Sequence, residues 1–500
     1  MNLNQIHNVY FIGIGGIGMS ALARYFQYIG KKVVGYDKTP TQLTDELQEI
    51  GLEIHFEDNI NLIPSDFYRE NTLVVVTPAV PVSHSEWNYF VEREYNIKKR
   101  AEVLGIITKD TYCFAVAGTH GKTTTSSILG HVLYESGVDV TAFLGGIVEN
   151  YNSNLIGSGK TVTVVEADEF DRSFLHLHPN VSCVTSMDAD HLDIYGDAAH
   201  IEESFREFAD KTPSENLYVI NGLPLEGNTI GVNNNADFSA QNIRIESGFY
   251  VFDVKTPTEL VQNVKFGLPG HHNLTNALLA FAMAKSYGVS NEKIIAALAS
   301  FKGVRRRFSF QIREEKLVYI DDYAHHPTEI NAVHQAVREL YPGKKIIAAF
   351  QPHLFSRTKD FVDGFAESLS QFDEILLLEI YPARELPMEG VNSTWLLNKI
   401  NNPNKKLVSK DELFRAFENS DADVFITIGA GDIGELVKDF FTEAVAAGGG
   451  TALLTLKDAN GREVVPTAPK PRQVISLLLL RRNALVQTGE LIDELWEQDP

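Results

Sequence analysis

The chain has few of the features that mark secreted or membrane proteins. Its 500 residues include only two cysteines, Cys113 and Cys183, and each lies in an apolar run that predicts a buried strand. Two such residues are more typical of reduced core thiols than of a disulfide or a metal pair. The chain also lacks a charged-then-apolar leader and any apolar run of about 18 residues. We therefore expect a soluble protein of the cytoplasm, with no membrane partner.

Basic residues are scarce as well. The chain has 44 Lys and Arg against 66 Asp and Glu, which gives a net charge of −22. This charge disfavours general binding to nucleic acid or to an anionic membrane, although a local basic pocket can still hold phosphates. Because 44% of the residues are hydrophobic, the chain can bury several cores, and its length predicts about three domains.

A glycine-rich turn joins a predicted buried strand at 113–117 to a predicted helix that starts at Thr123. Such a turn offers backbone N–H groups and a helix N-terminus to an anion, while Lys122 can reach terminal phosphates and the Thr123 hydroxyl can ligate Mg²⁺. The strict phosphate-loop template has a glycine where Val116 stands, so it is only partly met. We predict that ATP or GTP binds to the turn, which consists of Gly118, Thr119, His120, Gly121, Lys122, Thr123 and Thr124.

A second glycine turn follows a predicted strand near the N-terminus, and a helix at 21–29 and a strand at 32–36 come next. The strand ends at an acidic residue, which completes a dinucleotide-binding fingerprint. Alone, this fingerprint is typical of an NAD-dependent dehydrogenase, but the same turn can hold any pyrophosphate, including that of a UDP-sugar. Its residues are Gly13, Gly15, Gly16, Gly18 and Asp37.

Acidic clusters follow two predicted strands of the central region. Glu166, Asp168 and Glu169 come at the end of the strand at 159–166, and a second cluster from Asp188 to Asp193 follows the strand at 181–186. Ligands of open parallel sheets collect at the carboxyl ends of the strands, so we expect both clusters to meet Mg²⁺ there.

Further polar motifs lie in the second half of the chain. A helix opens after Gly270, with Asn273 expected as its N-cap, and an arginine run at 305–307 follows. Strands predicted at 317–321, 345–350, 374–379 and 424–428 indicate another doubly wound sheet. The first two of these strands lead into the polar segments 321–329 and 351–357.

These motifs, in this order between residues 8 and 440, resemble those of the Mur ligases, the ATP-dependent amide-forming enzymes of bacterial peptidoglycan synthesis. The resemblance implies an α/β fold with three doubly wound domains and an appended segment. The domains would be a Rossmann-like UDP-binding domain at 1–105, a P-loop ATPase-like central domain at 106–308 and a Rossmann-like C-terminal domain at 309–441, followed by the segment 442–500.

The resemblance also implies roles for residues. In the central and third domains, ATP would be bound by the phosphate loop together with His272, Asn273, Asn276, Arg307 and Asp322. We expect Arg307 to neutralise charge during phosphoryl transfer. The Mg²⁺ ligands would be Thr123, Glu166 and His191, and the catalytic set would be Lys122, Glu166, His191 and Arg307. The first glycine turn and Asp37 would hold the UDP substrate, and the amino acid would be received by His325, His326, His353 and Arg357.

The implied reaction activates the lactoyl carboxylate of UDP-N-acetylmuramate as an acyl phosphate and joins it to L-alanine, releasing ADP and phosphate. The implied partners are thus these two substrates, with ATP and Mg²⁺, and we expect a monomer or a weak homodimer. Three alternatives remain open at this point. They are the related ligase that reattaches a recycled tripeptide, a nicotinamide oxidoreductase that uses Gly13 to Asp37, and a regulatory NTPase or DNA-binding switch built on the C-terminal segment.

The segment after Phe441 changes composition. A Gly-rich linker ends at Gly450, and residues 470–496 resemble the opening of a winged-helix module of bacterial transcriptional activators. The resemblance stops before the recognition helix that would enter DNA. Because the charges of this segment nearly balance, we expect no binding to DNA. An unrelated amphipathic extension explains the pattern equally well.

Overall fold

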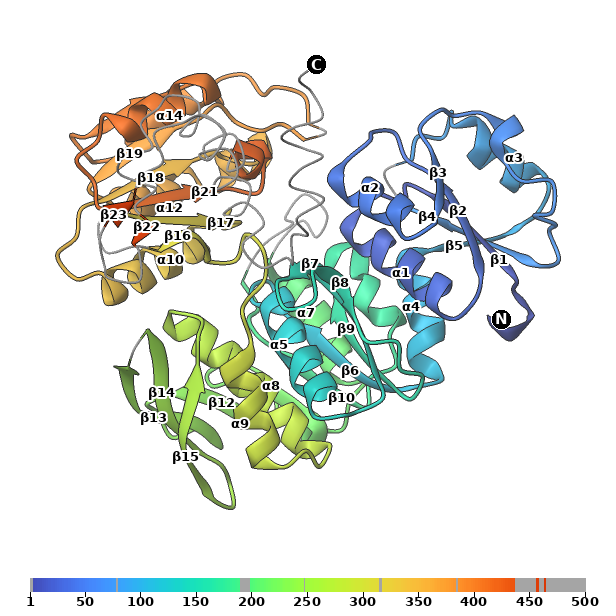
Figure 1. The fold of residues 1–500 in the computed structure, drawn as a ribbon, viewed down its shortest axis with the longest axis horizontal. Coiled ribbons are helices and arrows are strands. Elements are labelled where there is room, and N and C mark those ends of the chain that lie inside the picture. Colours follow the sequence, from blue (N-terminus) through green and yellow to red (C-terminus); the bar gives the residue numbers. More distant parts are fainter. Residues whose placement is uncertain are drawn as a thin grey trace.

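The computed structural model describes residues 3–77, 80–188, 198–246, 248–313, 317–383, 385–436, 456–457 and 463–464. Three sheets dominate it, and each forms a separate lobe in Figure 1. Helices pack on both faces of each sheet, so the prediction of three doubly wound α/β domains is confirmed. Of the appended segment, the structure describes two short paired strands, β22 (Leu456–Lys457) and β23 (Glu463–Val464).

The first domain has a five-stranded, all-parallel sheet in the order β3-β2-β1-β4-β5. This order is that of a Rossmann half, in which the central first strand delivers a glycine turn to the ligand side. Its strands are β1 (Asn8–Ile12), β2 (Lys32–Tyr36), β3 (Glu53–His55), β4 (Thr72–Val76) and β5 (Asn96–Lys99), and its helices are η1 (Leu3–Gln5), α1 (Ile17–Tyr28), α2 (Gln42–Glu49), η2 (Ile60–Leu62), α3 (Ser85–Glu92) and α4 (Arg100–Lys109).

The central domain has a ten-stranded sheet in the order β15-β14-β13-β12-β11-β10-β6-β9-β7-β8. Strand β6 lies at the point where the chain turns from one side of the sheet to the other, which is where such folds bind ligands. The strands are β6 (Tyr112–Ala117), β7 (Val140–Val148), β8 (Ser153–Ile156), β9 (Val162–Ala167), β10 (Val181–Val184), β11 (Leu217–Ile220), β12 (Asn228–Val232), β13 (Phe238–Glu246), β14 (Phe249–Lys255) and β15 (Leu260–Phe266). The helices are α5 (Lys122–Glu135), η3 (Phe170–His176), α7 (Ala198–Ala209), η4 (Ser214–Asn216), α8 (His271–Ser286) and α9 (Asn291–Ser300).

The third domain has a six-stranded sheet in the order β16-β17-β21-β18-β19-β20, parallel except for β16. Its strands are β16 (Ser309–Arg313), β17 (Val318–Asp322), β18 (Ile346–Phe350), β19 (Glu374–Leu377), β20 (Lys405–Leu407) and β21 (Val424–Ile428). Its helices are α10 (Pro327–Leu340), α11 (Phe355–Asp360), α12 (Val362–Leu369), α13 (Ser393–Lys399), α14 (Lys410–Glu418) and η5 (Asp432–Glu435).

The first and central domains share a hydrophobic core. Phe26 of α1 and Leu104 of α4 belong to the same buried cluster as Phe143 of β7 and Phe205 of α7. The first domain therefore covers one face of the central sheet, while α5, α8 and α9 cover the other. This packing holds the two glycine turns on one connected body.

Asn154 on β8 ties the two domains together. Its side chain is fully buried, and its Nδ2 donates to Ile17 O at 2.6 Å and to Ser20 Oγ at 2.8 Å in α1. We expect Asn154→Ala to lower the free energy of unfolding by about 1–3 kcal/mol, because the Ile17 carbonyl loses a buried donor. Thermal and urea unfolding would measure this loss, with Asn235→Ala, at an exposed position between β12 and β13, as the control. Equal stability of the two variants would contradict this role.

Two expectations about local structure need comment. Asn273 is not the N-cap of α8, because Gly270 takes that position with φ 93° and Asn273 lies inside the first turn. Its Nδ2 donates instead to Pro269 O at 2.7 Å.

Cys113 and Cys183 are buried free thiols, as expected. No helix in the described part of the chain combines the length and apolar character that a membrane crossing requires.

Candidate active site

The phosphate loop follows β6 directly and wraps over the start of α5. Gly118 has φ 131°, and Gly121, the N-cap of α5, has φ 83°. Both conformations favour glycine. The loop rests on the segment after β10, where the His120 amide donates to Ser186 Oγ at 2.8 Å and the Thr119 hydroxyl donates to Asp188 O at 2.8 Å. The segment after β10 thus holds the backbone of the loop in place.

Lys122 lies within this loop. Its Nζ donates to Gly118 O at 2.6 Å and is 2.7 Å and 2.9 Å from the two carboxylate oxygens of Glu169. Burial alone would lower the pKa of Lys122, but the negative charges of Glu169 and Asp168 outweigh it and raise that pKa. Lys122 is therefore a positive charge fixed in the loop, as phosphate binding requires.

Glu166, at the end of β9, lies beside the first residues of α5. Its carboxylate accepts hydrogen bonds from Gly145 N at 2.6 Å, Thr123 Oγ1 at 3.2 Å and Ser126 Oγ at 3.2 Å. The Glu166 carboxylate and the Thr123 hydroxyl are thus adjacent oxygen ligands of the type that Mg²⁺ takes alongside phosphate oxygens. This pair fits the ion.

The third expected metal ligand, His191, lies outside the described residues. Among the residues that the structure does describe, no three His, Cys, Asp or Glu side chains gather as a metal site.

The start of α8 lies against the phosphate loop. Asn276 Oδ1 accepts a hydrogen bond from Thr125 Oγ1 at 3.1 Å, and it lies 2.8 Å from where a Cβ on Gly121 would stand. Asn276 Nδ2 is 3.4 Å from Asn273 Oδ1, and both side chains are buried. His272 is exposed on the same turn. Asn276 therefore lies at the loop with Asn273 beside it, and Asn276 also joins α8 to α5.

The segment that joins the central and third domains carries Arg307. Its guanidinium lies over the Tyr323 ring, 5.1 Å from the centroid, and 3.9 Å from Glu329 Oε1. Asp322 accepts from Phe308 N at 2.6 Å and from Ala324 N at 2.7 Å. Burial raises the pKa of Asp322 to about 7, although Arg307 opposes this rise. Asp322 thus connects the joining segment to the third domain through its hydrogen bond with the Phe308 amide.

The expected amino-acid residues also gather in the third domain. The rings of His325 and His353 are 6.2 Å apart, and burial lowers the pKa of both, assisted by the charge of the buried Arg357. For His353 the pKa falls to about 4. His326 is the N-cap of α10 and accepts from the Thr328 amide at 3.3 Å, so of the two adjacent histidines it is the one that caps the helix.

The first glycine turn has the expected arrangement at the end of β1. Gly13 has φ 90°, and the Gly15 amide donates to Asp37 Oδ2 at 2.7 Å, while Gly16 is the N-cap of α1. A Cβ on Gly18 would lie 2.9 Å from Arg100 Cδ. Arg100 also pairs with Asp168 at 3.1 Å. Arg100 was not among the residues expected from the sequence, and it links the first glycine turn to the acidic end of β9.

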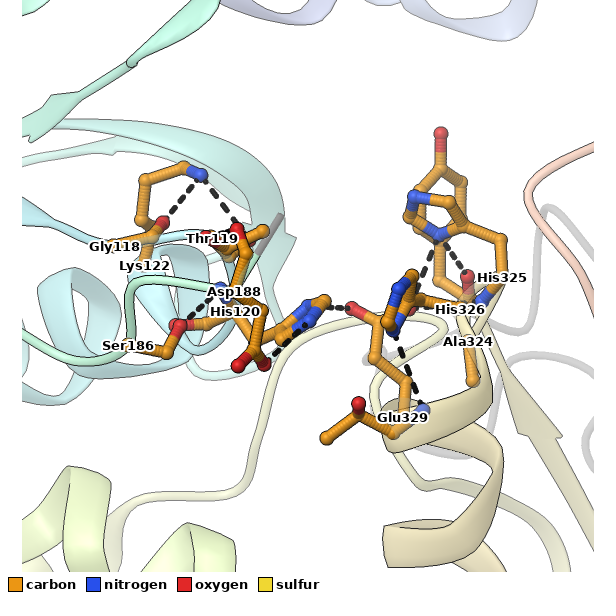
Figure 2. Close-up of polar contacts among 12 residues, drawn as sticks. Gly118, Thr119, His120, Lys122, Ser186, Asp188, Ala324, His325, His326 and Glu329 are labelled. Carbon is orange, nitrogen blue, oxygen red and sulfur yellow. Dashed lines mark hydrogen bonds and ion pairs between the residues drawn. The ribbon is translucent and has the colours of Figure 1, made fainter. Parts of the chain in front are cut away.

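The structure also joins the phosphate loop to the third domain. Figure 2 shows His120 between Asp188 and Glu329, with Nε2 at 3.2 Å from Asp188 Oδ2 and Nδ1 at 3.2 Å from Glu329 Oε1. Glu329 was not among the expected site residues, although it stands at the acidic first turn of α10. The start of α10 in the third domain thus lies against the loop that carries Lys122, an arrangement that suits ATP-driven condensation.

Three family models match the chain in order. They are the Mur ligase family catalytic domain over residues 8–112, the Mur ligase middle domain over 116–284, and the Mur ligase glutamate ligase domain over 306–431. The chain belongs to the Mur ligase family. It is 76% identical over 438 residues to the UDP-N-acetylmuramate–L-alanine ligase of Flavobacterium psychrophilum, which is 87% of this chain and 98% of that protein. The protein of the same name from Flavobacterium johnsoniae is 72% identical over 438 residues, with the same coverage of 87% and 98%.

Solved structures show the same architecture. The UDP-N-acetylmuramate-alanine ligase MurC of Thermotoga maritima superposes with a TM-score of 0.75 at 28% identity, covering 88% of this chain and 99% of that one. A murein peptide ligase from Psychrobacter arcticus has a TM-score of 0.62 at 23% identity and covers 87% and 98%. The second likeness shows the fold alone.

Proposed function

We propose that this chain joins L-alanine to the lactoyl carboxylate of UDP-N-acetylmuramate, using ATP. The observation that carries this proposal is the 76% identity with a ligase of that name along 98% of its length. The site geometry supports it, because the phosphate loop and the polar turn of the third domain meet at His120 and Glu329, 3.2 Å apart. A reaction in which ATP phosphorylates a carboxylate and an amine then takes up the acyl group needs these two parts together.

In the proposed reaction, the substrate carboxylate attacks the γ-phosphate of ATP, and the bond to ADP breaks to leave an acyl phosphate. The amine of L-alanine then attacks the acyl carbon, loses a proton, and displaces inorganic phosphate. Lys122 and Arg307 would offset charge on the transferred group, since phosphoryl transfer depends on positioning and electrostatics. Burial lowers the pKa of His325, so its neutral ring can accept the amine proton.

Thr123 and Glu166 would hold Mg²⁺, which when bound supplies positive charge to the phosphates. His191 stays a prediction as a further ligand. Three further sets of roles are proposals of the same kind. They are ATP binding by His272, Asn273, Asn276 and Asp322, UDP binding by the first glycine turn, and amino-acid binding by His353 and Arg357. The domain limits at 105, 308 and 441, the cytoplasmic location and the monomeric or weakly dimeric state also remain predictions.

Phosphate release tests the function directly. Purified protein with Mg-ATP and UDP-N-acetylmuramate should release phosphate only when L-alanine is added. Release only with L-alanyl-D-glutamyl-meso-diaminopimelate would assign the chain to tripeptide recycling instead. Quenching of NADH fluorescence on titration would favour the oxidoreductase alternative, and no quenching is expected.

Glu166→Gln tests the metal assignment. The amide oxygen can still accept from the Gly145 amide, so the fold should survive, but the charge that favours Mg²⁺ is lost. We expect the Mg²⁺ concentration for half-maximal activity to rise at least about tenfold. Glu207→Gln, on the exposed side of α7, is the control. An unchanged Mg²⁺ titration in Glu166→Gln would show that Glu166 is only a structural acceptor.

A further inference from the structure

The carboxylate of Glu329 contacts three separate parts of the site, and Figure 2 shows its contacts with His120 and with the turn at His325. Oε1 is 3.2 Å from His120 Nδ1 in the phosphate loop, and Oε2 accepts from the His325 amide at 2.9 Å in the turn of the third domain. Arg307 of the joining segment approaches Oε1 to 3.9 Å. The side chain is only 14% exposed. One carboxylate thus touches the expected phosphate-binding, linker and amino-acid regions.

His120 is held on both sides of its ring. Nε2 faces Asp188 at 3.2 Å, Nδ1 faces Glu329, and the ring packs 4.9 Å from that of His326. Burial would lower its pKa, but the hydrogen bonds to the two carboxylates raise the pKa of His120 to about 9. A charged imidazole therefore bridges a carboxylate of the central domain and one of the third domain.

Helix capping explains only half of this arrangement. Glu329 is the third residue of α10, and acceptance from the backbone amide at the preceding turn is the ordinary role of an acidic residue there. That role uses Oε2. It does not require Oε1 to face a histidine 209 positions away in another domain.

A second contact of α10 with the central domain lies at its other end. Tyr250 of β14 donates to Glu339 Oε2 at 2.6 Å, and the Gly270 amide donates to the Tyr250 hydroxyl at 3.1 Å. Ten residues of helix separate the two acidic side chains, so the contacts are about 15 Å apart along the axis. Helix α10 is therefore attached independently of Glu329, and losing the Glu329 contact should loosen only its first turn.

We propose that Glu329, acting through His120, is a positioning residue that sets the phosphate loop against the amino-acid turn of the third domain. The inference rests on the proposed function. In the working enzyme this contact fixes the distance between the acyl phosphate and the incoming amine. Neither residue takes part in bond making.

The test uses Glu329→Gln, His120→Gln and the double variant in the full chain. Gln at 329 keeps an acceptor for the His325 amide but loses the charge that holds His120. We expect kcat to fall about 10–100-fold, because small displacements of reacting groups cost factors of this size. KM for UDP-N-acetylmuramate should change less than about threefold, because Glu329 contacts the phosphate loop, the joining segment and the turn of the third domain rather than the first glycine turn.

The double variant gives the decisive comparison. If the two residues act as one contact, the double variant should lose no more than the worse single variant, whereas independent roles give losses that multiply. Glu339→Gln is the matched control on the same helix, with an expected loss of less than about fivefold. Multiplying losses, or equal losses in Glu339→Gln and Glu329→Gln, would overturn the proposal.

Amide hydrogen exchange separates this proposal from the proposed function, because it needs no turnover. In Glu329→Gln and His120→Gln, exchange should accelerate together in residues 118–122 and 323–326, and Glu339→Gln should leave both segments unchanged. If the wild-type protein released no phosphate in response to L-alanine, the proposed function would be refuted. The exchange rates of the variants could still be compared, because they do not depend on turnover. Unchanged exchange in both segments would refute the positioning role.

Discussion

Replacing Lys122 with alanine should reduce turnover by at least about 10²–10³-fold, because one fixed charge or donor at a developing anion contributes about that much to catalysis. Lys122 is a cation of the phosphate loop, held between the Gly118 carbonyl and the Glu169 carboxylate. Phosphate release with saturating L-alanine and UDP-N-acetylmuramate measures the loss.

The variant also loses stability, for a reason that is separate from catalysis. The Glu169 side chain is 4% exposed and pairs with Lys122 at 2.7 Å. Removing one partner of a buried pair costs about 3–5 kcal/mol, whereas replacing both partners is often neutral. We therefore expect Lys122→Ala to unfold more easily.

The double variant Lys122→Met/Glu169→Gln is the control for this loss of stability. It should regain most of the stability in urea unfolding while remaining inactive. Recovery of turnover in the double variant would show that Lys122 acts only through the fold.

The strands and glycine turns that carry the site were predictable. Strand β2 (Lys32–Tyr36) and strand β21 (Val424–Ile428) have the bounds read from the sequence. Four of the five residues of β21 are β-branched, and β2 contains the buried pair Val33 and Val34. Glycines of positive φ lie nearby, with Gly30 before β2 and Gly429 after β21. Gly118 and Gly121 were equally readable, because only glycine adopts their backbone angles at low cost.

The antiparallel strands β13, β14 and β15 were not anticipated. In β15 the exposed residues outnumber the buried ones, and the strand forms the edge of the sheet. A strand of this kind has little hydrophobic signal of its own, because its pairing partner provides the stabilisation. Yet β14 supplies Tyr250, which connects the start of α8 to α10.

The contacts between domains could not be predicted from the sequence either. Glu329 is recognisable there as an acidic residue at a helix start, and His120 as part of a phosphate loop. Their meeting depends on how the third domain is placed on the central one, which no local pattern encodes. Asn273 illustrates the same limit at short range. It was expected as the N-cap of α8, but Gly270, with its positive φ, is the N-cap, and Asn273 lies inside the first turn.

Gly118→Ala should also abolish most activity, in this case because the added methyl group changes the shape of the phosphate loop rather than its charge. A Cβ at Gly118 would lie 2.0 Å from Thr185 Oγ1 and 2.7 Å from Ser186 N. The second contact is with backbone, which cannot move aside without shifting the end of β10. The φ of 131° adds about 1–3 kcal/mol of strain for any residue with a side chain.

Relief of this clash should move the loop away from the segment after β10. We expect kcat to fall by about 10²-fold or more, since a displacement near 1 Å at a positioned group has that effect. ATP affinity, measured by calorimetry, should fall with it because the loop amides no longer converge.

Gly137→Ala provides the matched control. Gly137 follows α5 and has φ 82°. Apart from its chain neighbours, no heavy atom of the described residues lies within 4 Å of the Cβ position. That variant carries backbone strain of about 1–2 kcal/mol without a clash, so it should lose stability but keep ATP affinity and kcat. If both glycine variants lose activity equally, strain in the fold would account for the effect. Loss confined to Gly118→Ala would tie it to the shape of the phosphate loop.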